Sequence, residues 1–280
     1  MIIREKIYDC GEFMRVHYFP VRRKASGKRG KRNNPTSETQ ERLNAKNAAN
    51  KLTDLLHCNF TSDDISFGLD YDELHLPKTV EDAQKNVRNL IRRLKYSLRD
   101  KAKAKAVKYV FVTERSSTGR IHHHAVISGV VDRDTLESMW TFGRANTQRL
   151  QFDENGLCGK AHYITKGKAT KKRWCASKNL TRPTERQNDY RIGPKTVKHI
   201  MQNPYDSEYI QKLYPGFSVA PGGVDVPLPE DTGNLGGDMF VSLFLYKDDN
   251  KHFYRDKWGR LYSLRSCEER GREHEKGLYS

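Results

Sequence analysis

The sequence predicts an α+β fold with a central antiparallel sheet of about five strands, flanking helices, an N-terminal basic arm and a C-terminal extension. Short alternating apolar runs indicate strands, and longer runs with apolar residues at helical spacing indicate helices. In the middle of the chain their order is strand, helix, two strands, helix, strand, which is typical of helices packed on one antiparallel sheet. At 280 residues the chain suffices for one large domain or two small ones.

Residues 1–57 are predicted to form a unit that packs on the core. Residues 1–21 carry strand-like apolar residues around a Cys10-Gly11 turn, which favours a hairpin. Ser37 and Gln40 have the spacing of a capping box, and the apolar stripe behind them predicts a helix to His57. Between hairpin and helix lies an arm rich in cations and poor in apolar residues, with Arg22, Arg23, Lys24, Lys28, Arg29, Lys31 and Arg32.

Residues 58–215 are predicted to form the main domain. Its best-defined element is a helix capped by Thr79, whose apolar residues from Val80 to Leu98 follow the helical period closely. The other predicted elements are strands at 65–71, 107–113, 122–127, 147–152 and 174–176, and helices at 134–142, 157–166 and from Pro194 onward.

Residues 216–280 are predicted to form an extension. It begins with Pro221-Gly222-Gly223 and an acidic, proline-containing loop that reaches Gly237, which we interpret as a domain boundary. Strand-like runs follow at 239–246 and 262–264.

The composition indicates a soluble protein that binds a polyanion. The formal net charge is +16, and nucleic acid is the commonest partner of such a chain. The basic arm and Arg120 are the expected phosphate contacts, which supply affinity without reading sequence. No apolar run is long enough to span a membrane and no signal sequence is evident, so we expect a cytoplasmic protein. Five scattered cysteines argue against a disulfide framework.

Glu114, His122 and His124 form a candidate metal site. His122 and His124 alternate along one predicted strand and so share a face, while His123 points to the other. If the preceding strand pairs across the turn from Ser116 to Arg120, Glu114 lies beside the two imidazoles. Such a ligand set suits zinc and iron as well as harder cations. A pair of solvent-exposed histidines with no metal explains the alternation of His122 and His124 equally well.

Tyr163 and Lys166 are candidate catalytic residues. They are three apart on a predicted helix and therefore share a face. A phenol is a weak nucleophile at neutral pH, and a neighbouring cation and a metal-polarised phosphate would both assist its attack. The Tyr-x-x-Lys pattern alone is common, and it gains meaning only from the histidine strand that precedes it.

These motifs resemble those of the HUH endonucleases, in particular the rolling-circle replication initiators of bacteriophages and mobile elements that are similar to filamentous-phage gene II proteins. His122 to His124 match the His-hydrophobe-His motif except at His123, Glu114 matches the extra carboxylate ligand, and Tyr163 to Lys166 match the single-tyrosine motif. The resemblance extends over about residues 1–215 and includes the run from Lys172 to Leu180.

The resemblance implies a palm-like sheet and an enzyme that nicks one DNA strand at an origin and later rejoins it. Tyr163 would form a 5′-phosphotyrosine, Glu114, His122 and His124 would bind Mg²⁺ or Mn²⁺, and Lys166 would stabilise charge or position DNA. The expected partners are single-stranded origin DNA and host replication proteins such as a helicase and a polymerase, in the cytoplasm of a bacterial host cell. The chain contains no P-loop of its own.

The first family motif departs from the expected pattern. It reads Ile65 to Tyr71 here, and Gly68 and Asp70 stand where strand-forming residues are expected. We therefore expect this departure to affect the stability of the strand more than the chemistry of the candidate site.

Three alternatives remain open from the sequence. A non-catalytic DNA-binding protein of a phage or plasmid would bind DNA irrespective of metal and Tyr163. An HUH transposase or relaxase would share the chemistry, although relaxases generally present a third histidine in place of Glu114. A zinc hydrolase would use water as its nucleophile and form no covalent adduct.

Overall fold

The computed structural model describes residues 1–21, 38–166, 173–226, 239–249, 253–255 and 261–263. All seven cations of the predicted basic arm, Arg22 to Arg32, lie outside the described residues. None of the helices in the described part of the chain combines the length and apolar content needed to cross a bilayer.

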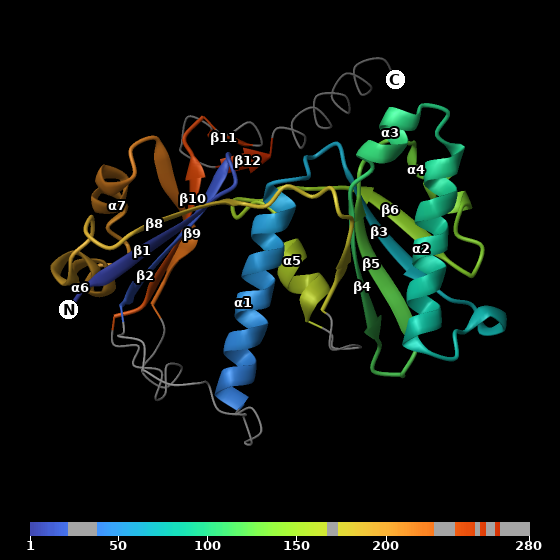
Figure 1. The fold of residues 1–280 in the computed structure, drawn as a ribbon, viewed down its shortest axis with the longest axis horizontal. Helices are drawn as coiled ribbons and strands as arrows, with labels where there is room; N and C mark the ends of the chain where they lie inside the picture. Colours follow the sequence, from blue (N-terminus) through green and yellow to red (C-terminus); the bar gives the residue numbers. More distant parts are fainter. Residues whose placement is uncertain (22–37, 167–172, 227–238, 250–252, 256–260, 264–280) are drawn as a thin grey trace, which may run out of the picture.

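Two antiparallel five-stranded sheets form the framework (Figure 1). We call the sheet with strand order β8-β1-β2-β10-β9 sheet A and the sheet with order β6-β3-β5-β4-β7 sheet B. Sheet A consists of β1 (Ile3–Asp9), β2 (Phe13–Pro20), β8 (Thr184–Asn188), β9 (Phe217–Asp225) and β10 (Val241–Lys247). Sheet B consists of β3 (Ile65–Asp70), β4 (Tyr109–Arg115), β5 (Ile121–Ile127), β6 (Ala145–Arg149) and β7 (Cys175–Ala176). β11 (Phe253–Arg255) and β12 (Leu261–Ser263) pair with each other.

Helices lie between the sheets and on their outer faces. Figure 1 shows α1 and α5 between sheets A and B, α6 and α7 beside sheet A, and α2 and α4 on the far side of sheet B. Their bounds are α1 (Glu38–His57), α2 (Val80–Ser97), α3 (Lys101–Ala106), α4 (Arg133–Ser138), α5 (Cys158–Thr165), α6 (Pro194–Gln202) and α7 (Ser207–Leu213). A short 3-10 helix, η1, covers Glu73–His75.

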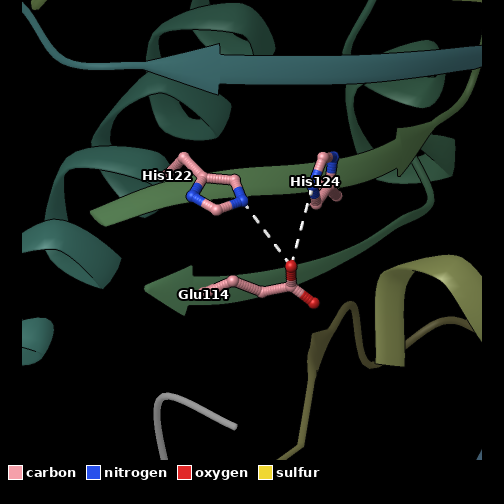
Figure 2. A group of neighbouring side chains, drawn as sticks. All are labelled: Glu114, His122 and His124. Atoms are coloured by element: carbon pink, nitrogen blue, oxygen red, sulfur yellow. Dashed lines mark ion pairs between the residues drawn. The ribbon is translucent and has the colours of Figure 1, made fainter. Parts of the chain in front are cut away.

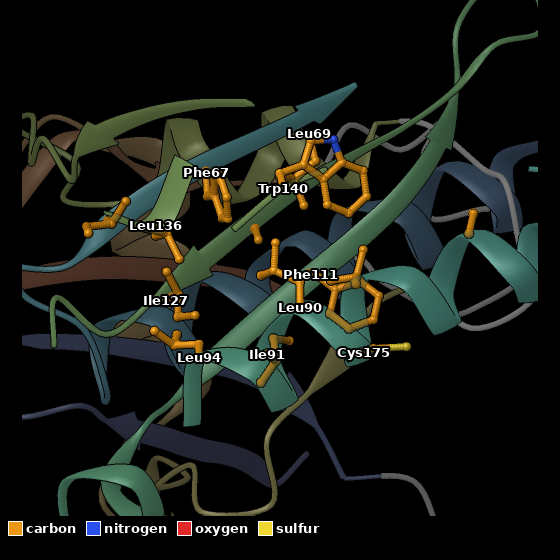
Figure 3. Packing of buried hydrophobic residues seen from close by; sticks show 14 of the residues in the cluster. Phe67, Leu69, Leu90, Ile91, Leu94, Phe111, Ile127, Leu136, Trp140 and Cys175 are labelled. Carbon is orange, nitrogen blue, oxygen red and sulfur yellow. The ribbon is translucent and has the colours of Figure 1, made fainter. Parts of the chain in front are cut away.

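Three apolar clusters hold these layers together. The first packs α2 against the outer face of sheet B, where Leu90, Ile91 and Leu94 meet Phe111 and Ile127 (Figure 3). The second joins the two sheets through α1 and α5, and the third packs α6 and α7 against sheet A. Sheet B is therefore covered by apolar contacts on both faces, and one of these faces also carries the candidate site.

The α+β class and an antiparallel five-stranded sheet are confirmed. The sequence does not predict the second sheet, because β2 pairs with β10, more than 200 residues away, and local periodicity carries no information about such pairing. The division into 1–57, 58–215 and 216–280 stays a prediction, although strand pairing links the first and last of these segments.

Several predicted boundaries need correction. The helix predicted at 134–142 ends at Ser138, and the loop expected at Pro221-Gly222-Gly223 is part of β9. The sequence also does not predict α3, α7, β8 or β11. β8 is exposed along its whole length, so it lacks the apolar alternation by which strands are found.

The start of α5 is held by a close contact with α1. The backbone N–H of Leu157 donates a 2.8 Å hydrogen bond to Nε2 of His57, and the His57 ring stacks on Phe13 with centroids 3.9 Å apart. Gly156 lies against this pair with φ +65°, and a Cβ there would come within 2.7 Å of the Phe13 ring and collide with His57. The absence of a side chain at Gly156 therefore lets α5 pack against α1 and sheet A.

We predict that Gly156→Ala lowers the free energy of unfolding more than Gly119→Ala does. Both glycines have positive φ, which costs an alanine about 1–3 kcal/mol, but a Cβ at Gly119 meets nothing within 4 Å. Overpacking adds about 1–3 kcal/mol at Gly156 alone. Chemical denaturation of both variants measures the difference, and equal losses would contradict the close packing.

Candidate active site

The pairing of β4 with β5 brings Glu114, His122 and His124 together. Glu114 lies directly opposite His122, and Val112 lies opposite His124. Directly opposed residues share one face of a sheet, and so do alternate residues along a strand. Figure 2 shows both imidazoles on β5 turned toward the carboxylate on β4.

The three side chains could hold a metal ion. Oε2 of Glu114 lies 3.5 Å from Nε2 of His122 and 3.8 Å from Nε2 of His124, and one donor atom from each residue lies within 4.8 Å of the others. Donors that bind one ion at about 2.0–2.2 Å lie at most about 4.4 Å apart, so small side-chain rotations complete such a site. Two imidazoles and a carboxylate accept several divalent ions, and the donor set does not select among them.

His123 points to the opposite face and is fully buried. Its Nε2 lies 3.0 Å from the hydroxyl of Tyr71, and its Nδ1 lies 2.9 Å from the hydroxyl of Thr113. Burial, followed by the neighbouring charges of His122 and His124, lowers the pKa of His123 to about 3. The ring is therefore neutral at physiological pH, and its two hydrogen bonds tie β5 to β4 and to the end of β3.

Helix α5 places Tyr163 beside this group. The ring centroid of Tyr163 lies 5.1 Å from that of His124, and the side chain is 60% exposed. Ala161 and Ile164 on the same helix are buried between the sheets, which fixes the helix and leaves Tyr163 at the surface. The tyrosine is thus both adjacent to the candidate metal ligands and accessible to a large substrate.

Lys160 is a further candidate site residue, and the sequence analysis did not predict it. Its Nζ lies 5.8 Å from the ring centroid of Tyr163, and burial lowers its pKa. The pKa of His124 is lowered to about 4 by burial, then by the neighbouring His122 and Lys160. The available signal was the spacing of Lys160, three residues before Tyr163 on one helix, which places the two side chains as neighbours.

Lys166 and His162 are exposed residues at the C-terminal end of α5. Lys166 is exposed and follows the last residue of α5, where its backbone N–H donates to the Tyr163 carbonyl at 3.4 Å. His162 is exposed, and its Nδ1 lies 2.9 Å from the carbonyl of Cys158, so its ring interacts with its own helix.

Arg120 lies at the turn between β4 and β5. Its guanidinium donates to Glu73 and, at 2.8 Å, to the carbonyl of Tyr71, and the residue is exposed. The structure therefore places this predicted DNA contact beside the candidate site, where it is already engaged with one carboxylate.

β3 forms a regular central strand despite Gly68 and Asp70. It pairs with β5 on one side and β6 on the other, and Gly68 stands directly opposite His124. A Cβ at Gly68 would meet only the Asn146 carbonyl, at 3.8 Å. A side chain would therefore fit at position 68. Its absence leaves the surface of the sheet beside His124 uncovered.

The fold and this group of side chains define an α+β protein with a candidate metal centre next to an accessible tyrosine. Residues 65–168 match the model of a family described as replication-associated protein, of the ORF2 and gene II protein type. The matched segment contains the five residues that the sequence predicts as metal ligands or catalytic groups: Glu114, His122, His124, Tyr163 and Lys166. The resemblance is confirmed over this segment, and it links the chain to DNA replication and DNA binding.

No curated protein and no solved structure matches the chain. The resemblance expected for residues 1–64 and 169–215 stays a prediction.

We predict that a divalent ion stabilises the folded chain through these three ligands. An ion that binds only the folded state adds about 2.7 kcal/mol at one hundred times its Kd, and thermal unfolding with Mn²⁺ or EDTA measures this gain. His122→Ala and His124→Ala should abolish it. His162→Ala, which removes a nearby exposed imidazole, should retain it, and loss of the gain in this control would argue against the assigned ligands.

Proposed function

We propose that this chain is a metal-dependent, single-tyrosine DNA nicking-joining enzyme that initiates rolling-circle replication. The observation that carries the proposal is the position of Tyr163, whose exposed ring lies 5.1 Å from the ring of a candidate metal ligand, His124. The match of residues 65–168 to a replication-associated family supports DNA as the substrate.

In this mechanism the Tyr163 oxygen attacks a phosphorus atom of single-stranded origin DNA. A bond forms between the tyrosine oxygen and phosphorus, and the bond from phosphorus to the 3′ oxygen breaks. The phenol releases its proton to water and the departing 3′ oxygen takes one up, so that charge and atoms balance. Attack by a 3′ hydroxyl on the phosphotyrosine reverses the step, which conserves the phosphodiester energy and requires no ATP.

Glu114, His122 and His124 would hold the ion, which we propose is Mg²⁺ or Mn²⁺. Such an ion supplies positive charge that polarises the phosphate. The ammonium of Lys160, partly buried beside the Tyr163 ring, favours the phenolate and the charge that develops on phosphate. The exposed Lys166 contacts the DNA backbone and positions it at the edge of the site.

Arg120 and the basic arm supply further phosphate contacts in this proposal. The 3′ end released by nicking would be extended by host replication proteins, a helicase and a polymerase, in the cytoplasm of a bacterial cell. Affinity for DNA then comes mainly from lysine and arginine, and the chemistry from the residues on β4, β5 and α5.

We predict that the purified protein forms a covalent adduct with labelled single-stranded oligonucleotides from its own origin. The adduct should require Mn²⁺ or Mg²⁺, disappear in EDTA and be absent in Tyr163→Phe. Denaturing electrophoresis detects it. The matched control Tyr96→Phe changes an exposed tyrosine on α2 and should leave adduct formation unchanged.

The alternatives give different outcomes in the same assay. Metal-dependent cleavage with no adduct would indicate water as the nucleophile. DNA binding without cleavage of any origin fragment, unaffected by metal or by Tyr163→Phe, would indicate a binding protein.

We predict that the two lysines of this region affect different kinetic parameters. Lys160→Met should lower kcat about 100-fold, since loss of one preorganised charge-stabilising group typically costs about 10²–10³. Lys166→Met should mainly raise KM, because an exposed backbone contact adds similar binding energy to the ground and transition states. Steady-state nicking of an origin oligonucleotide separates these effects. Equal kcat values for Lys160→Met and the wild type would refute the role of Lys160.

A further inference from the structure

A groove separate from the candidate active site lies on the face of sheet A that α1 covers. It has a volume of about 1040 Å³ and is bounded by the strand surface, the side of α1 and the segment from Trp174 to Glu185. Its lining residues include Lys6, Tyr8, Arg15 and His17 on β1 and β2. None of the lining residues falls within the segment 65–168 that matches the replication-associated family, and none belongs to the site on sheet B.

A row of aromatic rings crosses the floor of the groove. Tyr8 on β1 and His17 on β2 have ring centroids 5.6 Å apart, and His17 and Phe240 are also 5.6 Å apart. Phe19 and Trp174 add two further half-buried rings to the lining. Aromatic surfaces of this kind stack the bases of single-stranded nucleic acid irrespective of sequence.

The charge of the groove is predominantly positive. Lys6 pairs with Glu185 at 2.8 Å and Arg15 pairs with Asp54 at 2.9 Å, so both carboxylates that line the groove are neutralised. The remaining lining cations, Lys51, Lys178 and Arg182, are exposed and have no carboxylate partner among the described residues. Three free cations beside a row of rings match the alternation of phosphates and bases along a single strand.

Two nitrogen atoms of groove-lining side chains are buried without a hydrogen-bond partner. Nη2 of Arg15 and Nδ1 of His17 have no hydrogen-bond partner among the described residues. The Arg15 side chain is only 6% exposed, so its Nη2 is also shielded from solvent. Burial, followed by the charges of Arg15, Lys6 and Lys46, lowers the pKa of His17 to about 4, so its imidazole is neutral at physiological pH. Because both atoms are buried, they lie beneath the groove surface, and a ligand in the groove meets a neutral imidazole and a guanidinium that is already paired with Asp54.

We propose that this groove binds a short segment of single-stranded DNA outside the nicking site, with bases stacked on the aromatic row and phosphates held by Lys51, Lys178 and Arg182. The choice of DNA as ligand rests on the proposed function of the chain. The groove would retain one part of the strand while another part occupies the site on sheet B, so it contributes affinity and no chemistry.

Binding of an oligothymidine of about 20 nucleotides to the full-length chain tests the proposal. All proteins carry Tyr163→Phe and all solutions contain EDTA, so binding is measured without cleavage and independently of nicking. Lys178→Glu combined with Arg182→Glu should weaken binding at least about tenfold. The slope of log K against log salt concentration should become shallower by about 1.4, because each phosphate contact with a single strand contributes about 0.7 to this slope. Lys195→Glu combined with Lys198→Glu, at exposed positions of α6, makes the same charge change away from the groove and should have little effect.

The stacking part of the proposal has its own test. Tyr8→Ala and Trp174→Ala should each weaken binding of oligothymidine by about fivefold or more, and neither should weaken binding of an abasic oligonucleotide of equal length. Thermal unfolding establishes that each variant is folded. Equal effects of the groove and α6 charge variants, or equal loss with thymidine and abasic strands, would overturn the proposal. The absence of any covalent adduct in the nicking assay would refute the proposed enzyme while leaving this binding result intact.

Discussion

The register between β4 and β5 is the constraint on which the rest of the candidate site depends. Glu114 stands opposite His122, and a slip of one residue would turn the imidazoles of His122 and His124 to the other face of the sheet. The buried ring of His123 opposes such a slip, because its hydrogen bonds to Tyr71 and Thr113 exist only in the observed register. The HUH motif that this strand resembles has a bulky hydrophobe at this position, and the polar His123 is accommodated here because both of its ring nitrogens have partners.

The second sheet explains how a short helix can hold Tyr163 in place. α5 has only eight residues, too few for stability on its own, and its position is set by packing between sheets A and B. α1 supplies the neighbouring surface, and His57 fixes the first turn through its bond to Leu157. The N- and C-terminal strands therefore contribute to the geometry of a site that lies within the matched segment.

The two proposals place chemistry and DNA affinity on different surfaces of the molecule. The three candidate metal ligands and Tyr163 lie on sheet B and α5, and the Nζ of Lys160 lies 5.8 Å from the Tyr163 ring centroid. The groove on sheet A offers rings and free cations but no group of potential metal ligands among the described residues. A replication protein that keeps hold of its strand through nicking and rejoining would gain from such a division, since contacts in the groove do not change as the phosphodiester breaks.

The amino-acid sequence was enough to predict the local features of this protein: the helix capped by Thr79, the two strands that carry Glu114 and the histidines, the helix of Tyr163, and the positive charge. These features depend on the period of the side chains and on contacts over a few residues. Three other features became evident only in the folded chain: the pairing of β2 with β10, the position of Lys160 beside the Tyr163 ring, and the basic aromatic groove on sheet A. These features join segments that are far apart in the chain or depend on side-chain burial. They could not be predicted because the period of apolar residues specifies which face of a helix or strand is buried, but not which other element covers that face.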